Sequence, residues 1–76
     1  MPRYFFDADN GSCVRDEVGM TFIDDNSARV EAIHRAALFA SNADNLEAPG
    51  AIVITVRDEA DARVLTVRLV FQIERG

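Results

Sequence analysis

Two apolar runs, at residues 51–56 and 64–73, constrain the fold more than any other feature of the chain. Large apolar residues alternate with other residues in both runs, and successive side chains of a strand point to opposite faces of a sheet. A loop at residues 58–62 separates the runs, so we expect an antiparallel hairpin with one apolar face. The residues of that face are Ile52, Ile54, Val56, Leu65, Val67, Leu69, Phe71 and Ile73.

A second hairpin is predicted at the start of the chain, on either side of Asn10-Gly11. This dipeptide favours a tight turn, because both residues tolerate the positive φ angles that such turns need. We expect strands at about residues 3–9 and 12–15. A two-residue turn would place an apolar residue opposite Arg15, whereas a three-residue loop gathers apolar side chains on one face. We prefer the second, since register follows the hydrophobic pattern; the residues gathered are Tyr4, Phe6, Ala8 and Val14.

Phe5 lies on the opposite face of the first predicted strand, where its neighbours Arg3, Asp7 and Asp9 are charged. An apolar ring in this setting is covered by the stem of an arginine or by another chain, unless it is one of the single exposed apolar residues common on protein surfaces. Phe5 is therefore a candidate interface residue. Val53 is another, because it lies on the outer face of the later hairpin without local cover.

The segment between the hairpins has the composition and periodicity of a helix. Asp24 or Asp25 is a suitable N-cap, and we expect the helix to run to Asn42 or Asp44, with Pro49-Gly50 as the stop beyond it. Its apolar residues fall in one broad arc, which suits a helix laid closely against a sheet. The residues of the arc are Ala28, Val30, Ala32, Ile33, Ala36, Ala37, Phe39, Ala40 and Ala43.

The polar arc of this helix contains two further interface candidates, Leu38 and His34. Leu38 lies in the middle of an arc that polar and charged residues otherwise fill, so its side chain faces away from the predicted core. His34 precedes it by one turn and is the only histidine of the chain. A lone helical histidine beside charged residues is typically a solvated surface residue, so we assign it no catalytic role.

The order of strands, one helix and strands predicts a single α+β domain over residues 1–76. The sheet would be antiparallel with four to five strands, and the helix would lie across one face. A chain of this length buries only about 60% of the surface that its unfolded form exposes, and one helix covers only part of such a sheet. Both observations lead us to expect self-association, as a homodimer.

Composition and charge exclude several classes of partner. Thirteen acidic residues oppose eight arginines and no lysine, the formal net charge is -5, and the arginines are scattered. Nucleic-acid binding needs clustered positive charge, so we expect no such partner. The chain has no apolar run of about 18 residues and no basic start followed by an apolar stretch, so we expect neither a membrane span nor a signal peptide. Cys13 has no second cysteine to pair with, and we expect a cytoplasmic protein.

No motif indicates a catalytic, cofactor or metal site. The segment DADNGSCVRDE resembles an EF-hand calcium loop only superficially, because Gly11, Ser12 and Val18 stand where that loop needs an acidic or amide residue, Gly and Glu. The adjacent carboxylate pairs of the chain fall in predicted turns or at the helix start, where they have structural roles. We therefore expect no cofactor and no enzymatic activity.

The segment VRDEVG at residues 14–19 recurs as VRDEAD at residues 56–61. In both places a predicted strand leads through Arg into Asp-Glu before an apolar stretch resumes. Asp at the first position of a turn can accept a hydrogen bond from the backbone two residues later. The repeat therefore predicts two similar turns.

The opening MPRYFF, the turn RDEVG, the helix start DDNSARVEAIHRAA and the segment VRDEADARVLTV resemble a family of short uncharacterised bacterial proteins. That family, a domain of unknown function, typically opens M-P-R-Y-F-F and carries a D-E-x-G turn, an Ala-rich helix and a final D-E-x-G hairpin. The resemblance covers nearly the whole chain, and Asp61 departs from it, because family members more often have Gly there. The family has no established activity, so the resemblance implies no functional residue.

These observations leave two main hypotheses about function. The first is a non-enzymatic domain that self-associates. The second is an antitoxin-like or regulatory module that binds a protein partner, because an acidic chain suits a basic partner and the strand order is similar to that of small antitoxin domains. A third class, a small-ligand or metal-binding protein, has the least support, since no polar residues are predicted to converge.

Overall fold

The computed structural model of the protein describes residues 1–46 and 50–76. Within these residues it has one α-helix and one five-stranded antiparallel sheet, so the predicted α+β class is confirmed. Pro49, which belongs to the expected helix stop, lies outside the described residues. The elements are β1 (Arg3–Asp9), β2 (Cys13–Val14), β3 (Met20–Thr21), α1 (Asp25–Ala40), the 3-10 turn η1 (Ala43–Asn45), β4 (Gly50–Arg57) and β5 (Arg63–Phe71).

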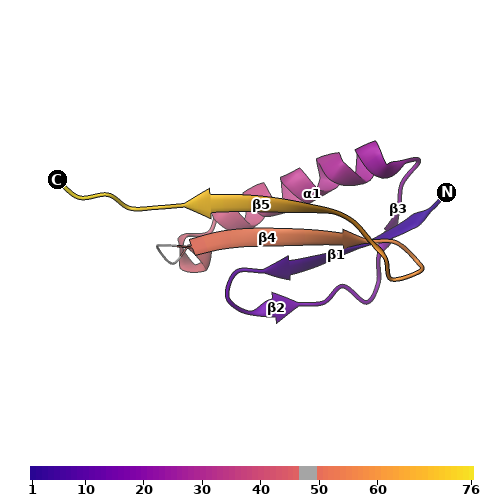
Figure 1. Cartoon of the computed structure of the whole chain (residues 1–76), viewed down its shortest axis with the longest axis horizontal. Helices are drawn as coiled ribbons and strands as arrows, with labels where there is room; N and C mark the ends of the chain where they lie inside the picture. Colours follow the sequence, from indigo (N-terminus) through magenta and orange to yellow (C-terminus); the bar gives the residue numbers. More distant parts are fainter. Residues whose placement is uncertain (47–49) are drawn as a thin grey trace.

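The sheet has the strand order β2-β1-β4-β5, and each neighbouring pair is antiparallel. The short strand β3 pairs with the start of β1. The central strands are therefore β1 and β4, and β5 forms one edge. Figure 1 shows α1 on the side of the sheet where β4 and β5 lie, with β2 at the far side. No helix of the described residues is long and apolar enough to cross a membrane.

The first hairpin has the three-residue loop that the hydrophobic pattern predicts. Ala8 pairs with Val14 and Asp9 pairs with Cys13, and Gly11 in the loop has a φ angle of +112°. Val14 lies on the same face as Ala8, as this register requires, yet its side chain is 62% exposed. The reason is the position of α1, which packs on β4 and β5 and leaves β2 uncovered.

The helix begins at the expected cap and ends earlier than predicted. Asp24 is the N-cap, and its carboxylate accepts a hydrogen bond from the backbone N–H of Ser27 at 2.8 Å. At the other end the Ser41 hydroxyl donates to the carbonyl of Leu38, and the side-chain amide of Asn45 donates to the carbonyl of Phe39. These side chains satisfy carbonyls of the last turn, so α1 stops at Ala40 and the 3-10 turn follows.

The core lies between α1 and the helix-facing side of β1 and β4. Three small residues of α1 face the sheet and allow a close approach, and full burial of each large aliphatic side chain of β4 contributes about 1.5–3 kcal/mol. The predicted apolar arc of the helix was too wide, because Val30 and Ile33 are exposed. The buried residues are Tyr4, Phe6, Ala8, Ala28, Ala32, Ala36, Ile52, Ile54 and Val56.

The last strand ends two residues before the predicted limit. Gly50, the first residue of β4, pairs with Phe71, so the described part of β4 offers no partner to the residues that follow. Ile73 was expected on the buried face, but it is exposed in the tail beyond β5. Figure 1 shows this tail extending away from the rest of the molecule.

Candidate functional site: the open face, the helix groove and the free edge

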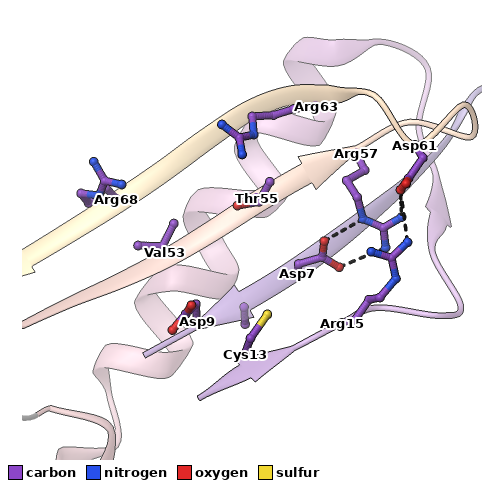
Figure 2. Close-up of a pocket in the computed structure, with 11 residues that line it drawn as sticks. Asp7, Asp9, Cys13, Arg15, Val53, Thr55, Arg57, Asp61, Arg63 and Arg68 are labelled. Atoms are coloured by element: carbon purple, nitrogen blue, oxygen red, sulfur yellow. Dashed lines mark hydrogen bonds and ion pairs between the residues drawn. The ribbon is translucent and has the colours of Figure 1, made fainter. Parts of the chain in front are cut away.

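Arg57, at the end of β4, is the centre of a polar network on the sheet face opposite α1 (Figure 2). Its guanidinium donates two hydrogen bonds to the Asp7 carboxylate on β1, from Nε to Oδ2 at 2.6 Å and from Nη2 to Oδ1 at 3.0 Å. The side chains are only 11% exposed for Arg57 and 15% for Asp7. The hydrogen bond from Arg57 holds the pKa of Asp7 below its ordinary value of 3.8, so the pair is ionised at neutral pH.

The two VRDE segments form similar turns, which confirms the prediction from the repeat. Asp16 Oδ1 accepts hydrogen bonds from two backbone N–H groups of the first turn, and Asp58 Oδ1 accepts two in the second. The corresponding positions Gly19 and Asp61 both have positive φ angles, +74° and +66°. The shared sequence therefore specifies a shared turn conformation.

Asp61 joins the two turns through its carboxylate. Its Oδ1 accepts hydrogen bonds from Arg57 Nη1 at 2.8 Å and from Arg15 Nη2 at 3.2 Å, as Figure 2 shows. The bond from Arg57, followed by that from Arg15, lowers the pKa of Asp61. Asp tolerates the left-handed region better than most residues, and these two contacts hold Asp61 in that conformation.

Phe5 is covered by its own chain rather than left fully open. The Arg57 guanidinium lies 5.0 Å from the centre of the Phe5 ring. On another side, a Cβ atom added to Gly19 would lie 2.9 Å from Cε1 of the ring, so only Gly fits at this contact. Phe5 is half-buried as a result. Of the two kinds of cover considered from the sequence, the structure shows the arginine.

A hollow of about 470 Å³ lies beside this network on the open face. Val53 lies in it between Asp9 and Arg68, its partners on the two neighbouring strands. Within the described residues, Arg63 and Arg68 form no ion pair. The carboxylates of the hollow accept hydrogen bonds from arginines or from the backbone, so they are engaged in structure. The lining residues are Asp7, Ala8, Asp9, Cys13, Arg15, Val53, Thr55, Arg57, Asp61, Arg63 and Arg68.

A groove of about 450 Å³ on the other side of the sheet contains Leu38 and His34. Both are exposed, and the groove runs between α1 and the helix-facing side of β1. Arg35 covers part of its floor, because its guanidinium lies 4.3 Å from the centre of the Phe6 ring while Nε pairs with Glu31 at 2.7 Å. The four interface candidates therefore divide, with Leu38 and His34 on the helix side and Phe5 and Val53 on the open face.

The β2 edge of the sheet is closed by side chains rather than by a long strand. The Asp16 carboxylate accepts a hydrogen bond from the backbone N–H of Phe6 at 3.0 Å, and the Asp7 carboxylate accepts one from the backbone N–H of Asp16 at 2.9 Å. Burial opposes ionisation of Asp16, but the bonds from Phe6, Gly19 and Val18 outweigh it and lower its pKa. The charged carboxylates thus occupy backbone groups that another strand would use.

The β5 edge lacks this protection. β5 is nine residues long and pairs with β4 except at Val64, where a β-bulge interrupts the ladder, and no described strand pairs with its other side. Leu69 and Val70 are exposed on it. The helix flank nearest to β5 carries an apolar residue too: Leu38 faces the β1 side, and at about 100° per residue Ile33 falls on the opposite flank, toward β5, whereas Val30 points to solvent. We name Ile33, Leu69, Val70 and the edge together the β5 surface.

The comparison with protein families agrees with the sequence resemblance. The family described as "Domain of unknown function (DUF6894)" matches residues 3–70. The chain belongs to this family. No curated protein and no solved structure matches it.

The DUF6894 match spans the whole polar network and almost all of β5. Sequence reasoning identified the faces of the strands but missed the β5 surface, because alternation along a strand says nothing about which strand lies beside it. The sequence did contain a signal for an unprotected edge strand. Residues 64–71 form a long run of β-prone residues with one charge, at Arg68, and no proline, whereas charged residues and prolines usually protect an edge strand.

Proposed function

We propose that this member of the family is a non-enzymatic domain that self-associates through the β5 surface. The single observation that carries the proposal is the nine-residue β5 strand, whose outer side has no partner within the described residues. An unpaired edge strand presents a row of backbone donors and acceptors that can pair with another strand. The exposed side chains of Leu69 and Val70 add apolar area to this row.

The size of the chain supports the same proposal. A domain of 76 residues has a small core, and here the large residues buried completely are three side chains of β4. Pairing at β5 would bury further apolar surface on both the strand and the adjacent helix flank. Association therefore supplies burial that the isolated chain lacks.

The proposal that the domain is not an enzyme rests on where its ionisable groups lie. Asp7, Asp16 and Asp61 accept hydrogen bonds from arginines or backbone N–H groups, which gives each a structural role. His34 lies in the groove on the helix side, whereas Asp7 and Asp61 line the hollow on the open face. General acid–base catalysis needs such groups within reach of one substrate, and this arrangement separates them.

The test is light scattering behind a sizing column, across a concentration series, on the wild type and two matched variants. Val70→Glu places a charge on the β5 surface, and Leu38→Glu places one in the helix groove; the native side chains are 65% and 56% exposed. We expect a wild-type dimer that Val70→Glu dissociates and Leu38→Glu leaves intact. Circular dichroism checks that both variants remain folded.

Two outcomes would overturn this proposal. A wild-type mass of one chain at high micromolar concentration would remove self-association and make an antitoxin-like or regulatory module with a basic partner the stronger hypothesis, given the net charge of -5. Dissociation by Leu38→Glu but not by Val70→Glu would place the self-interface in the helix groove.

A further inference from the structure

We infer that the second copy pairs with β5 in antiparallel orientation about a two-fold axis at Val67, so that the two sheets become one continuous sheet. This inference rests on the proposed self-association and adds the geometry of the partner. Closed two-fold dimers are the commonest homo-oligomers, and they use the same patch on both copies. Antiparallel pairing of one strand with its own copy meets that condition.

Symmetry restricts the possible registers. Opposite residues in an antiparallel pair project to the same face of the sheet. A two-fold axis between two β5 strands therefore passes beside a residue that faces its own copy, and both helices lie on the same face. The residue that faces its own copy therefore defines the register.

A β-bulge leaves Val64 without a partner on β4, so the regular part of β5 is Leu65–Phe71. Val67 is the midpoint of Arg63–Phe71, and an axis there pairs Leu65 to Leu69 regularly. Leu65 then faces Leu69 of the second copy on the helix side, and Thr66 faces Arg68 of the second copy on the open face. This register covers Leu69, which is exposed in the single chain.

The neighbouring registers are less favourable. An axis at Arg68 sets two guanidinium groups directly opposite one another, and like charges in such a pair destabilise a sheet. An axis at Thr66 places Leu69 opposite Arg63, whose side chain lies on the open face because of the bulge at Val64, so Leu69 has no facing side chain on the helix side. An axis at Leu69 leaves the first part of the strand unpaired. With the axis at Val67 the two Arg68 side chains are only diagonal neighbours on the solvated open face, where salt screens their repulsion.

The helices support the same arrangement. Because α1 packs across β4 and β5, and strands lie about 4.8 Å apart, the axes of the two helices would be roughly 10 Å apart. That separation is the usual distance for packed helices. The facing flank of each helix carries Ile33, which is exposed in the single chain. Association would therefore bury apolar residues on the helices as well as on the strands.

A cysteine scan reads the register directly. In a Cys13→Ser background, which removes the exposed native thiol, single substitutions Thr66→Cys, Val67→Cys and Arg68→Cys are oxidised and analysed by non-reducing electrophoresis and mass spectrometry. Facing residues have Cα atoms about 4.5–5.5 Å apart, within disulfide range. We expect a covalent dimer from Val67→Cys alone, because the copies of the other two residues are offset to roughly 8 Å.

A second variant guards against loss of folding at the half-buried Val67. Thr66 and Arg68 are both exposed, so the double variant Thr66→Cys/Arg68→Cys tests the same register without touching the core. We expect it to form a dimer joined by two disulfides, each from residue 66 of one copy to residue 68 of the other. The single variants serve as its controls.

The outcomes separate this inference from the proposed function. A protein that is dimeric by light scattering but cross-links through Thr66→Cys or Arg68→Cys alone, or through neither Val67→Cys nor the double variant, would overturn the register and leave self-association standing. A protein that is monomeric would overturn both.

Discussion

The two edges of the sheet differ in how their backbone groups are satisfied. At the β2 edge the strand is only two residues long, and the carboxylates of Asp7 and Asp16 accept hydrogen bonds from backbone N–H groups beyond it. At the β5 edge a nine-residue strand has a free outer side within the described residues. The β2 edge is therefore blocked to pairing with another chain, whereas the β5 edge is available for such pairing.

This difference shows what closing an edge requires. Asp16 reaches the backbone of β1 because a turn holds it, and Asp7 stays ionised because Arg57 pairs with it. Arg57 is held in turn by Asp61 and by the carbonyl of Asp16. The repeated VRDE segments thus protect one edge, whereas β5 contains no carboxylate and is interrupted only by the bulge at Val64. We expect substitutions in the network to lower folding stability and substitutions on β5 to change association.

The largest effect is expected from Gly19→Ala, which disturbs the turn behind the closed edge. The added Cβ would lie 2.9 Å from the backbone oxygen of Tyr4 and 2.9 Å from the Phe5 ring, at a φ angle of +74°. We expect the free energy of unfolding to fall by about 2–3 kcal/mol. Gly11→Ala is the matched control: its φ angle is also positive but its Cβ meets no atom within 4 Å, so a loss of about 1 kcal/mol is expected. Urea titrations measure the loss for each variant, and equal losses would contradict a close contact of the added Cβ at position 19.

Asp7→Asn is expected to have the next largest effect. It removes the nearly buried one of the two carboxylates that pair with Arg57 and leaves only the exposed Asp61, so we expect a loss of about 2 kcal/mol in the free energy of unfolding. Asp9→Asn is the control on the same strand, because Asp9 is exposed and a change within about 0.5 kcal/mol is expected. If both variants unfold at the wild-type urea concentration, the Asp7–Arg57 pair contributes nothing to the closed edge.

Acid should weaken folding while leaving association at β5 unchanged. The folded-state pKa values of Asp7 and Asp16 lie below the ordinary 3.8, so the unfolded chain binds protons first as the pH falls. Stability is therefore complete above about pH 5 and is lost as the pH falls through 3.8 toward the folded-state values. β5 contains no carboxylate. Unfolding and light scattering, each measured as a function of pH, follow the two effects. A dimer that dissociates at a higher pH than the one at which folding stability declines would contradict the difference between the two edges.

The smallest effect concerns Tyr4, which ties β1 to the start of the helix. Its hydroxyl donates to Asp25 Oδ1 at 2.5 Å, and this bond raises the pKa of Tyr4 to about 12 from 10.0. The neutral form is favoured, so its contribution to stability is present below pH 10 and lost as the pH rises toward 12. The chain has one Tyr and no Trp, so ultraviolet absorbance follows this group alone. The substitution Asp25→Asn should lower the pH midpoint of the Tyr4 titration. An unchanged midpoint would show that the hydrogen bond to Asp25 does not cause the raised pKa.

Local features could be predicted because their causes lie within a few residues. Asp24 caps the helix with its own side chain, and the two VRDE turns form around Asp16 and Asp58. The register of the first hairpin also followed from the pattern of apolar residues, which only the three-residue loop places on one face. In each case the partner atoms are close in sequence, so the residue types specify the contact.

Features that depend on the lateral position of the helix could not be predicted. Val14 lies on the helix-facing side of the sheet and Ile33 lies on the flank of the helix toward β5, yet their side chains are exposed. The periodicity of a segment states which side chains share a face, but it does not state which strands that face covers. The position of α1 over β4 and β5 decided their exposure.

By itself, the sequence determined the α+β class, the strand faces and the turns, since alternation, capping and turn chemistry act over short separations. Only the tertiary structure decided that Asp7 on β1 meets Arg57 on β4, that Leu38 and His34 share a groove, and that β5 is left at an edge. The physical reason is that strand order is set by the packing of the whole core, to which every element contributes, whereas each strand's own pattern is compatible with more than one neighbour.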